Sequence, residues 1–165
     1  MTATTKAATR VLKSLSMALL MGLFSLSVFA QDKPGTRDEA KKMVDDAIAH
    51  IKAVGVEKAF EDFTNNQQPG SKWKDRDLYL FCYKMDGVNS CHGANKALVG
   101  KNLWELKTAD GKLLMQEFAA LIKSKGSGWV DYKWTHPQTK QIDDKSAYVA
   151  KIPGYDGYLG AGVYR

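Results

Sequence analysis

The 165-residue sequence predicts an α+β domain in which a five-stranded antiparallel sheet carries a long N-terminal helix on one face. Three observations predict this class. Apolar residues recur every three or four positions after residue 36, the spacing changes to two at residue 77, and three glycine-punctuated β segments close the chain. Because helical and strand patterns occur in blocks, we expect hairpins and meanders rather than parallel βαβ units.

The first thirty residues have the layout of a secretory signal peptide. They carry three basic residues and no acidic one, followed by an apolar run from Leu15 to Phe29 that is shorter than the ~20 residues of a membrane-spanning helix. Val28-Phe29-Ala30 fits a cleavage motif, so we expect cleavage after Ala30 and a periplasmic or secreted protein. An uncleaved membrane anchor is the alternative. Residues 31–36 then form a leader, and residues 37–165 form a single domain.

Charge argues against a nucleic-acid partner. The formal net charge is +6, and loss of the three basic residues of the signal peptide leaves +3. The remaining basic residues are interspersed with acidic ones, so no continuous phosphate-binding stripe is expected.

Two helices open the domain. Thr36 and Glu39 form a capping-box pattern at the start of the first. One apolar stripe follows at helical spacing, formed by Ala40, Met43, Val44, Ala47, Ile48 and Ile51. Gly55 interrupts the pattern, and a short second helix is expected from Val56 to Phe63.

Strands and one more helix complete the domain. Leu78 to Tyr83 and Val88 to His92 are expected to pair as a hairpin around Asp86-Gly87. A helix is expected within residues 112–125, ended by Gly126. The last three strands are expected at residues 128–134, 145–152 and 158–164.

The hairpin predicts a disulfide between Cys82 and Cys91. If Asp86-Gly87 is a two-residue turn, these cysteines face each other as a non-hydrogen-bonded pair, whose Cα atoms lie about 4.5 Å apart. An oxidising compartment favours the bond. The alternative is two buried thiols, since a bulge that shifts the register would separate them.

Several segments together resemble the single Cache domain family. They are Asp77 to Gly87, Val99 to Leu103, Gly128 to Trp134, Ser146 to Val149 and Pro153 to Tyr164. The similarity covers residues 37–164 and implies a PAS-like fold. It also implies an extracytoplasmic sensing role, commonly for small carboxylates. In such a domain the ligand lies against the sheet beneath loops and a short helix, and the long helix covers the opposite face.

A carboxylate needs a cation, hydroxyl or amide donors, and an apolar floor. Tyr79 and Phe81 share a face with His92, and Tyr132 shares a face with Trp134. Lys145 alternates away from Tyr148, so these two share a pocket only if their strand bends or starts later. Taken alone, each aromatic side chain fits core packing at least as well as a ligand wall. The candidate ligand-binding residues are Tyr79, Phe81, His92, Asn95, Tyr132, Trp134, Lys145 and Tyr148.

The sequence offers no pattern of an enzyme or a metal site. Two cysteines and three histidines occur without paired CxxC or CxxCH spacing, so no metal, haem or other cofactor is expected. His92 is adjacent to Cys91 on a strand, hence points to the opposite face and cannot activate that thiol. No serine–histidine–aspartate, phosphate-loop or paired-carboxylate motif stands out.

The leading interpretation is a non-enzymatic sensor module for a small organic acid of the acetate, propionate, pyruvate or lactate type. Because the printed sequence ends at Arg165, one residue after the last expected strand, we expect either signalling through a separate membrane protein or a soluble module that only binds or scavenges its ligand. The alternative is a structural module that forms a homodimer through the stripe of the first helix and binds no ligand.

Overall fold

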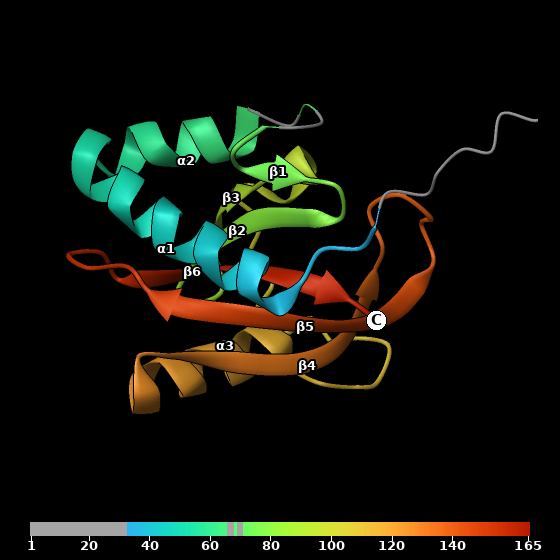
Figure 1. Ribbon diagram of the computed structural model, residues 1–165. Helices are drawn as coiled ribbons and strands as arrows, with labels where there is room; N and C mark the ends of the chain where they lie inside the picture. The colour runs from blue at the N-terminus through green and yellow to red at the C-terminus, as the bar shows by residue number, and fades with distance from the viewer. Residues whose placement is uncertain (1–32, 66–67, 69–70) are drawn as a thin grey trace, which may run out of the picture. The chain divides into compact units, whose positions relative to one another are not determined.

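The computed structural model describes residues 33–65, 68 and 71–165, and all structural statements concern these residues (Figure 1). The expected signal peptide and its cleavage after Ala30 lie outside the described residues. Within the described ranges, none of the helices combines the length and hydrophobicity needed to cross a bilayer.

The N-terminal half opens with two helices, α1 (Arg37–Val54) and α2 (Val56–Asn65). The predicted capping box is present, since the Thr36 side chain accepts from the Glu39 backbone N–H while the Glu39 carboxylate accepts from the Thr36 N–H. Gly55 ends α1 at a φ of 86°, a conformation that glycine adopts without steric cost.

The apolar stripe of α1 packs inside the chain. Five of its six residues are buried and join one hydrophobic cluster with the sheet, while Ile48 is partly buried against the same cluster. The stripe is therefore covered by the chain's own sheet, and the structure does not support its use as a homodimer interface.

The antiparallel sheet has the order β1-β2-β6-β5-β4, with β3 also paired to β2. The strands are β1 (Lys74–Asp75), β2 (Leu78–Lys84), β3 (Asn89–His92), β4 (Ser127–Thr135), β5 (Ile142–Lys151) and β6 (Gly157–Tyr164). The sequence predicted five of these six. The two-residue β1 was missed because so short a segment shows no periodicity, and it pairs with β2 through Tyr79 and Leu78, while β3 pairs further along β2.

The sheet separates two cores, as Figure 1 shows with α1 and α2 on one side and α3 (Leu114–Lys125) on the other. Alternate residues of β2 supply both cores: Leu78, Leu80 and Cys82 face α1, whereas Tyr79, Phe81 and Tyr83 face α3. Between β3 and α3 the chain forms only a 3₁₀ turn, η1 (Lys96–Leu98), with turns and isolated bridges.

The turn of the β2–β3 hairpin differs from the predicted one, but the hairpin still pairs Cys82 with Cys91. The turn has three residues rather than two, since Lys84 pairs with Val88 and the Gly87 N–H donates to the Lys84 carbonyl. A register shift follows between Cys82 and Tyr83, which places Tyr83 opposite Asn89 and leaves one extra residue on β3. The extra residue in the turn shifts the pairing by one position, and the extra residue in β3 shifts it back. Cys82 therefore still faces Cys91.

The predicted disulfide is present. Cys82 and Cys91 are bonded, with their Cα atoms 4.7 Å apart, and both residues are fully buried in the cluster beneath α1. The bond ties β2 to β3 behind the face that carries His92.

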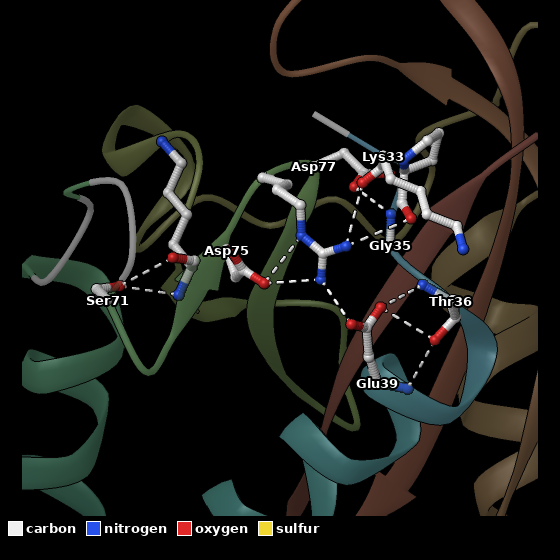
Figure 2. Close-up of polar contacts among 10 residues, drawn as sticks. Lys33, Gly35, Thr36, Glu39, Ser71, Asp75 and Asp77 are labelled. Atoms are coloured by element: carbon white, nitrogen blue, oxygen red, sulfur yellow. Dashed lines mark hydrogen bonds and ion pairs between the residues drawn. The ribbon is translucent and has the colours of Figure 1, made fainter. Parts of the chain in front are cut away.

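The segment leading into α1 is held by the turn between β1 and β2 (Figure 2). Arg76 donates to the carboxylates of Asp75 and Glu39 at 2.7 and 2.8 Å and to the Lys33 carbonyl at 3.1 Å. Asp77, which is buried, accepts from the Gly35 N–H at 2.8 Å. Residues 33–36 are thereby fixed to the start of β2.

Candidate ligand-binding site

A small cavity lies between the sheet and α3. Its volume is about 10 Å³, near the smallest space that holds one water molecule. Strands β2, β3 and β4 and the first half of α3 line it with Tyr79, Phe81, Tyr83, His92, Tyr132, Trp134, Leu114, Met115 and Phe118. The lining is therefore mainly aromatic, with hydroxyl, imidazole and indole groups among the rings.

Glycines on β6 make room for this hollow. A Cβ at Gly160 would lie 2.6 Å from the Phe81 ring, and one at Gly162 would lie 2.7 Å from Cε of Lys145. Both distances are too short for real atoms, so only glycine fits at either position. Because β6 lies between β2 and β5, these missing side chains let the Phe81 ring and the Lys145 stem lie across the centre of the sheet.

Lys145 is the one fully buried lysine among the described residues. Its side-chain nitrogen Nζ donates to the Tyr79 hydroxyl at 2.7 Å and to the Tyr164 hydroxyl at 3.3 Å. It also lies 3.9 Å from the ring centre of Tyr79 and 4.5 Å from that of Tyr164. Because Tyr79 also lines the cavity, its hydroxyl connects Lys145 to the cavity wall through a single hydrogen bond.

Burial controls the ionisation of this cluster. It lowers the pKa of Lys145 well below its ordinary value, and the negative charge of Asp77 offsets only part of that change. Burial also raises the pKa of Tyr79 and Tyr164, so both phenols are neutral at physiological pH. Within the described ranges no carboxylate forms an ion pair with Lys145, and neutral oxygens are its hydrogen-bond partners.

His92 is a neutral group on the cavity wall. Its Nδ1 accepts from the backbone N–H groups of Ala94 and Asn95 at 3.2 and 3.0 Å, so the imidazole proton is on Nε2. Burial, helped by the charge of Lys145, lowers the pKa of His92 to about 3. The ring lies against Tyr79, with the centroids 5.2 Å apart.

The structure brings most of the sequence-predicted residues together. Tyr79, Phe81, His92, Tyr132 and Trp134 line the cavity, and Lys145 contacts Tyr79.

Two predicted residues lie elsewhere. Tyr148 belongs to the opposite face, where its ring lies 5.4 Å from that of Trp129 and packs against the cluster beneath α1. Asn95 is exposed, and its side chain accepts from the Ala97 N–H at the start of η1. β5 runs without a bulge against both of its neighbours, so Lys145 and Tyr148, three residues apart, must face opposite sides.

Sequence reasoning missed the α3 residues that cover the cavity and Tyr164, the second phenol that contacts Lys145. Leu114, Met115 and Phe118 come from α3, whose position over the sheet has no local sequence signal. Tyr164 could have been found, because the alternation along β6 places it on the same face as Tyr158 and because the paired strands set it opposite Lys145.

In the described part of the chain, no three residues among histidine, cysteine, aspartate and glutamate come together in a way that could hold a metal ion.

An antiparallel sheet with a capped N-terminal helix behind it, and an aromatic cavity under a short helix in front, defines a PAS-like ligand-binding domain. The family model described as the Cache domain matches residues 36–165. This chain therefore belongs to the Cache domain family.

Two curated relatives are signalling proteins. The chain is 29% identical over 145 residues to the sensor histidine kinase MctS of Rhizobium johnstonii, covering 85% of this chain and 31% of that protein. It is 27% identical over 90 residues to the methyl-accepting chemotaxis protein McpP of Pseudomonas putida, covering 54% of this chain and 16% of that protein. The chain thus spans a third or less of the length of these relatives.

Solved structures share the fold. A methyl-accepting chemotaxis protein from Vibrio parahaemolyticus superposes with a TM-score of 0.65 at 24% identity, covering 77% of this chain and 86% of that one. A structure described as the basis for carboxylic acid recognition by a Cache chemosensory domain has a TM-score of 0.63 at 25% identity, covering 77% and 91%. Sensor domains of chemotaxis proteins and histidine kinases are therefore the relatives of this chain, and one of them recognises carboxylic acids.

Proposed function

We propose that this chain is an extracytoplasmic sensor domain that binds a small monocarboxylate of the acetate, propionate, pyruvate or lactate type. It binds its ligand without catalysis and signals through a separate membrane protein. The observation that carries the proposal is Lys145, a fully buried lysine with hydroxyl neighbours and no paired carboxylate, placed beside an aromatic cavity.

The chemistry of the cavity favours a small, singly charged ligand. One basic side chain, Lys145, lies beside the cavity, and apolar surface from Phe81, Phe118 and Leu114 suits a short hydrocarbon tail. The likeness to a Cache domain that recognises carboxylic acids supports the same ligand class. The relationship to a sensor kinase and a chemoreceptor supports a role in signalling.

Ligand entry requires rearrangement, because the cavity holds about one water molecule. The segment 93–113 contains one 3₁₀ turn and isolated bridges and leads directly into the first turn of α3. Most of its residues are exposed, and an exposed connection of this kind opens more readily than the strands below it. We therefore expect Leu114 and Met115, which line the cavity at the start of α3, to move outward when an acid binds.

Thermal unfolding of the purified protein tests the proposal. Acetate, propionate, pyruvate and lactate are added in turn, and propionamide serves as a neutral analogue of propionate. A ligand at one hundred times its Kd stabilises the native state by about 2.7 kcal/mol, which shifts the melting temperature measurably. At least one acid should raise the melting temperature, and propionamide should not.

Two variants of β5 locate the effect. Lys145→Met should lose the shift, whereas Lys151→Met, which removes an exposed lysine of the same strand, should keep it. A panel in which no acid shifts the unfolding temperature, or in which propionamide acts as strongly as propionate, would exclude the proposed function.

A further inference from the structure

The surroundings of Lys145 contain almost no compensating charge. The residue is completely buried, and its Nζ contacts two phenol hydroxyls. Its stem lies against Gly162 and fills the space that a Cβ at this position would occupy. A buried amine in such a place is strongly disfavoured as a cation until an anion arrives.

The titratable groups around Lys145 do not supply that anion. From β2, β3, β4 and β6 it faces Tyr79, His92, Tyr132 and Tyr164, whose neutral forms burial favours at physiological pH. Asp77 is the carboxylate whose charge acts on Lys145, and one of its oxygens already accepts from Gly35 (Figure 2).

Charged groups further out are engaged elsewhere or act on other residues. On β5 itself, Asp144 pairs with Lys133 at 2.7 Å, and the charge of Asp143 acts on Tyr164. Beyond the sheet edge, the ring of His136 lies against Tyr164, with centroids 4.4 Å apart.

We propose that a carboxylate binds to this site together with one proton, which Lys145 takes up from solvent. The inference rests on the proposed function and adds to it. One N–H bond forms, the amine becomes an ammonium ion, and the ligand remains a carboxylate, so no covalent bond of the ligand changes. The site gains one positive and one negative charge, and the new ion pair is neutral as a whole. A neutral pair is the least costly way to bury an anion in an apolar, aromatic cavity.

Proton uptake changes what the domain senses. If anion and proton bind together, occupancy depends on the product of their concentrations, which is proportional to the concentration of the undissociated acid. The domain would then respond more strongly to a carboxylic acid in acidified surroundings than to the same anion at alkaline pH.

Calorimetry on the unmodified protein tests this directly. Propionate, acetate, pyruvate and lactate are titrated at pH 8 in buffers with different ionisation enthalpies. These acids have carboxyl pKa values far below 8, so they are fully ionised and exchange no proton themselves. The dependence of the heat on the buffer should show uptake of about one proton per bound acid. Between pH 7 and 9, affinity should fall by up to about tenfold per pH unit.

Two variants identify the group that takes up the proton. His92→Gln should still take up a proton with any acid that it binds, and loss of uptake would assign the proton to His92 instead. Lys151→Met should behave like the unmodified protein. NMR of ¹⁵N-labelled lysine side chains gives an independent reading: without ligand, Lys145 should titrate at much lower pH than the other lysines.

The outcomes separate this inference from the proposed function. Binding of an acid without buffer-dependent heat, or a Lys145 that is fully charged at pH 8 without ligand, would overturn proton uptake and leave the proposed function standing. Failure of all four acids to bind would overturn both.

Discussion

Replacing Lys145 with methionine should stabilise the ligand-free protein while abolishing anion binding. Burial without a paired carboxylate penalises the charged form of Lys145 and lowers its pKa, a cost of several kcal/mol for an ion in a protein interior. Methionine has similar length and no charge, and it loses two hydrogen bonds worth about 1 kcal/mol each. The partners left behind stay satisfied, because Tyr79 and Tyr164 hydroxyls lie 3.1 Å apart and Tyr164 donates to the Thr135 carbonyl.

The net expectation is a gain of about 2–4 kcal/mol in the free energy of unfolding at pH 7, or about 5–12 °C in melting temperature. The gain should depend on pH. Because the unfolded chain binds a proton at Lys145 that the folded chain does not, this residue makes wild-type stability rise as pH approaches 10.5. The difference between the two proteins should therefore shrink from pH 7 to pH 10.

Urea unfolding at several pH values measures this difference, with Lys151→Met as the control, which should change stability by no more than about 0.5 kcal/mol. A Lys145→Met protein that is less stable than wild type at pH 7, or a difference that does not vary with pH, would refute the argument.

Three further changes test other parts of the structure. Replacing Cys82 and Cys91 by alanine together should lower the free energy of unfolding by about 2–3 kcal/mol, because the bond closes a loop with a sequence separation of 9; a loss below ~1 kcal/mol in urea unfolding would contradict this. His92 has a folded-state pKa of about 3 against 6.5 unfolded, so it contributes stability above pH 6.5 that is lost as pH falls toward 3. His92→Gln should therefore flatten the stability slope between pH 4 and 6 by up to about 1.4 kcal/mol per pH unit, and an unchanged slope would count against a buried neutral imidazole. Gly162→Ala should destabilise the protein by about 1–3 kcal/mol in thermal unfolding, because its Cβ would lie 2.7 Å from Cε of Lys145 and 2.8 Å from the Ser146 carbonyl oxygen; a tolerated alanine would mean that the Lys145 stem can move aside.

Local signals explain why most of the fold could be predicted. Thr36 and Glu39 marked the start of α1, Gly126 marked the end of α3, and the alternation along β2 assigned its residues to the two faces. The turn at Asp86-Gly87 was predicted one residue too short, because both turn types suit a glycine with positive φ. The Cys82–Cys91 pair survived only because a bulge in β3 restored the register.

The site was less predictable, because it depends on how elements meet. β6 lies between the strands that carry Lys145 and Tyr79. The two side chains meet across β6 because Gly162 has no side chain to separate them. That arrangement becomes visible only after the strand order is known. Tyr148 was misplaced for a simpler reason, since residues three apart on a regular strand face opposite sides. The position of α3 over the cavity depends on tertiary packing alone.

A crystal structure of the protein with the acid that gives the largest thermal shift tests the central claim most directly. We predict a carboxylate oxygen within about 2.7–3.2 Å of Nζ of Lys145 or the hydroxyl of Tyr79, with Leu114 and Met115 displaced outward. An acid bound on the α1 side of the sheet, or on the surface with the aromatic cavity unchanged, would contradict the account.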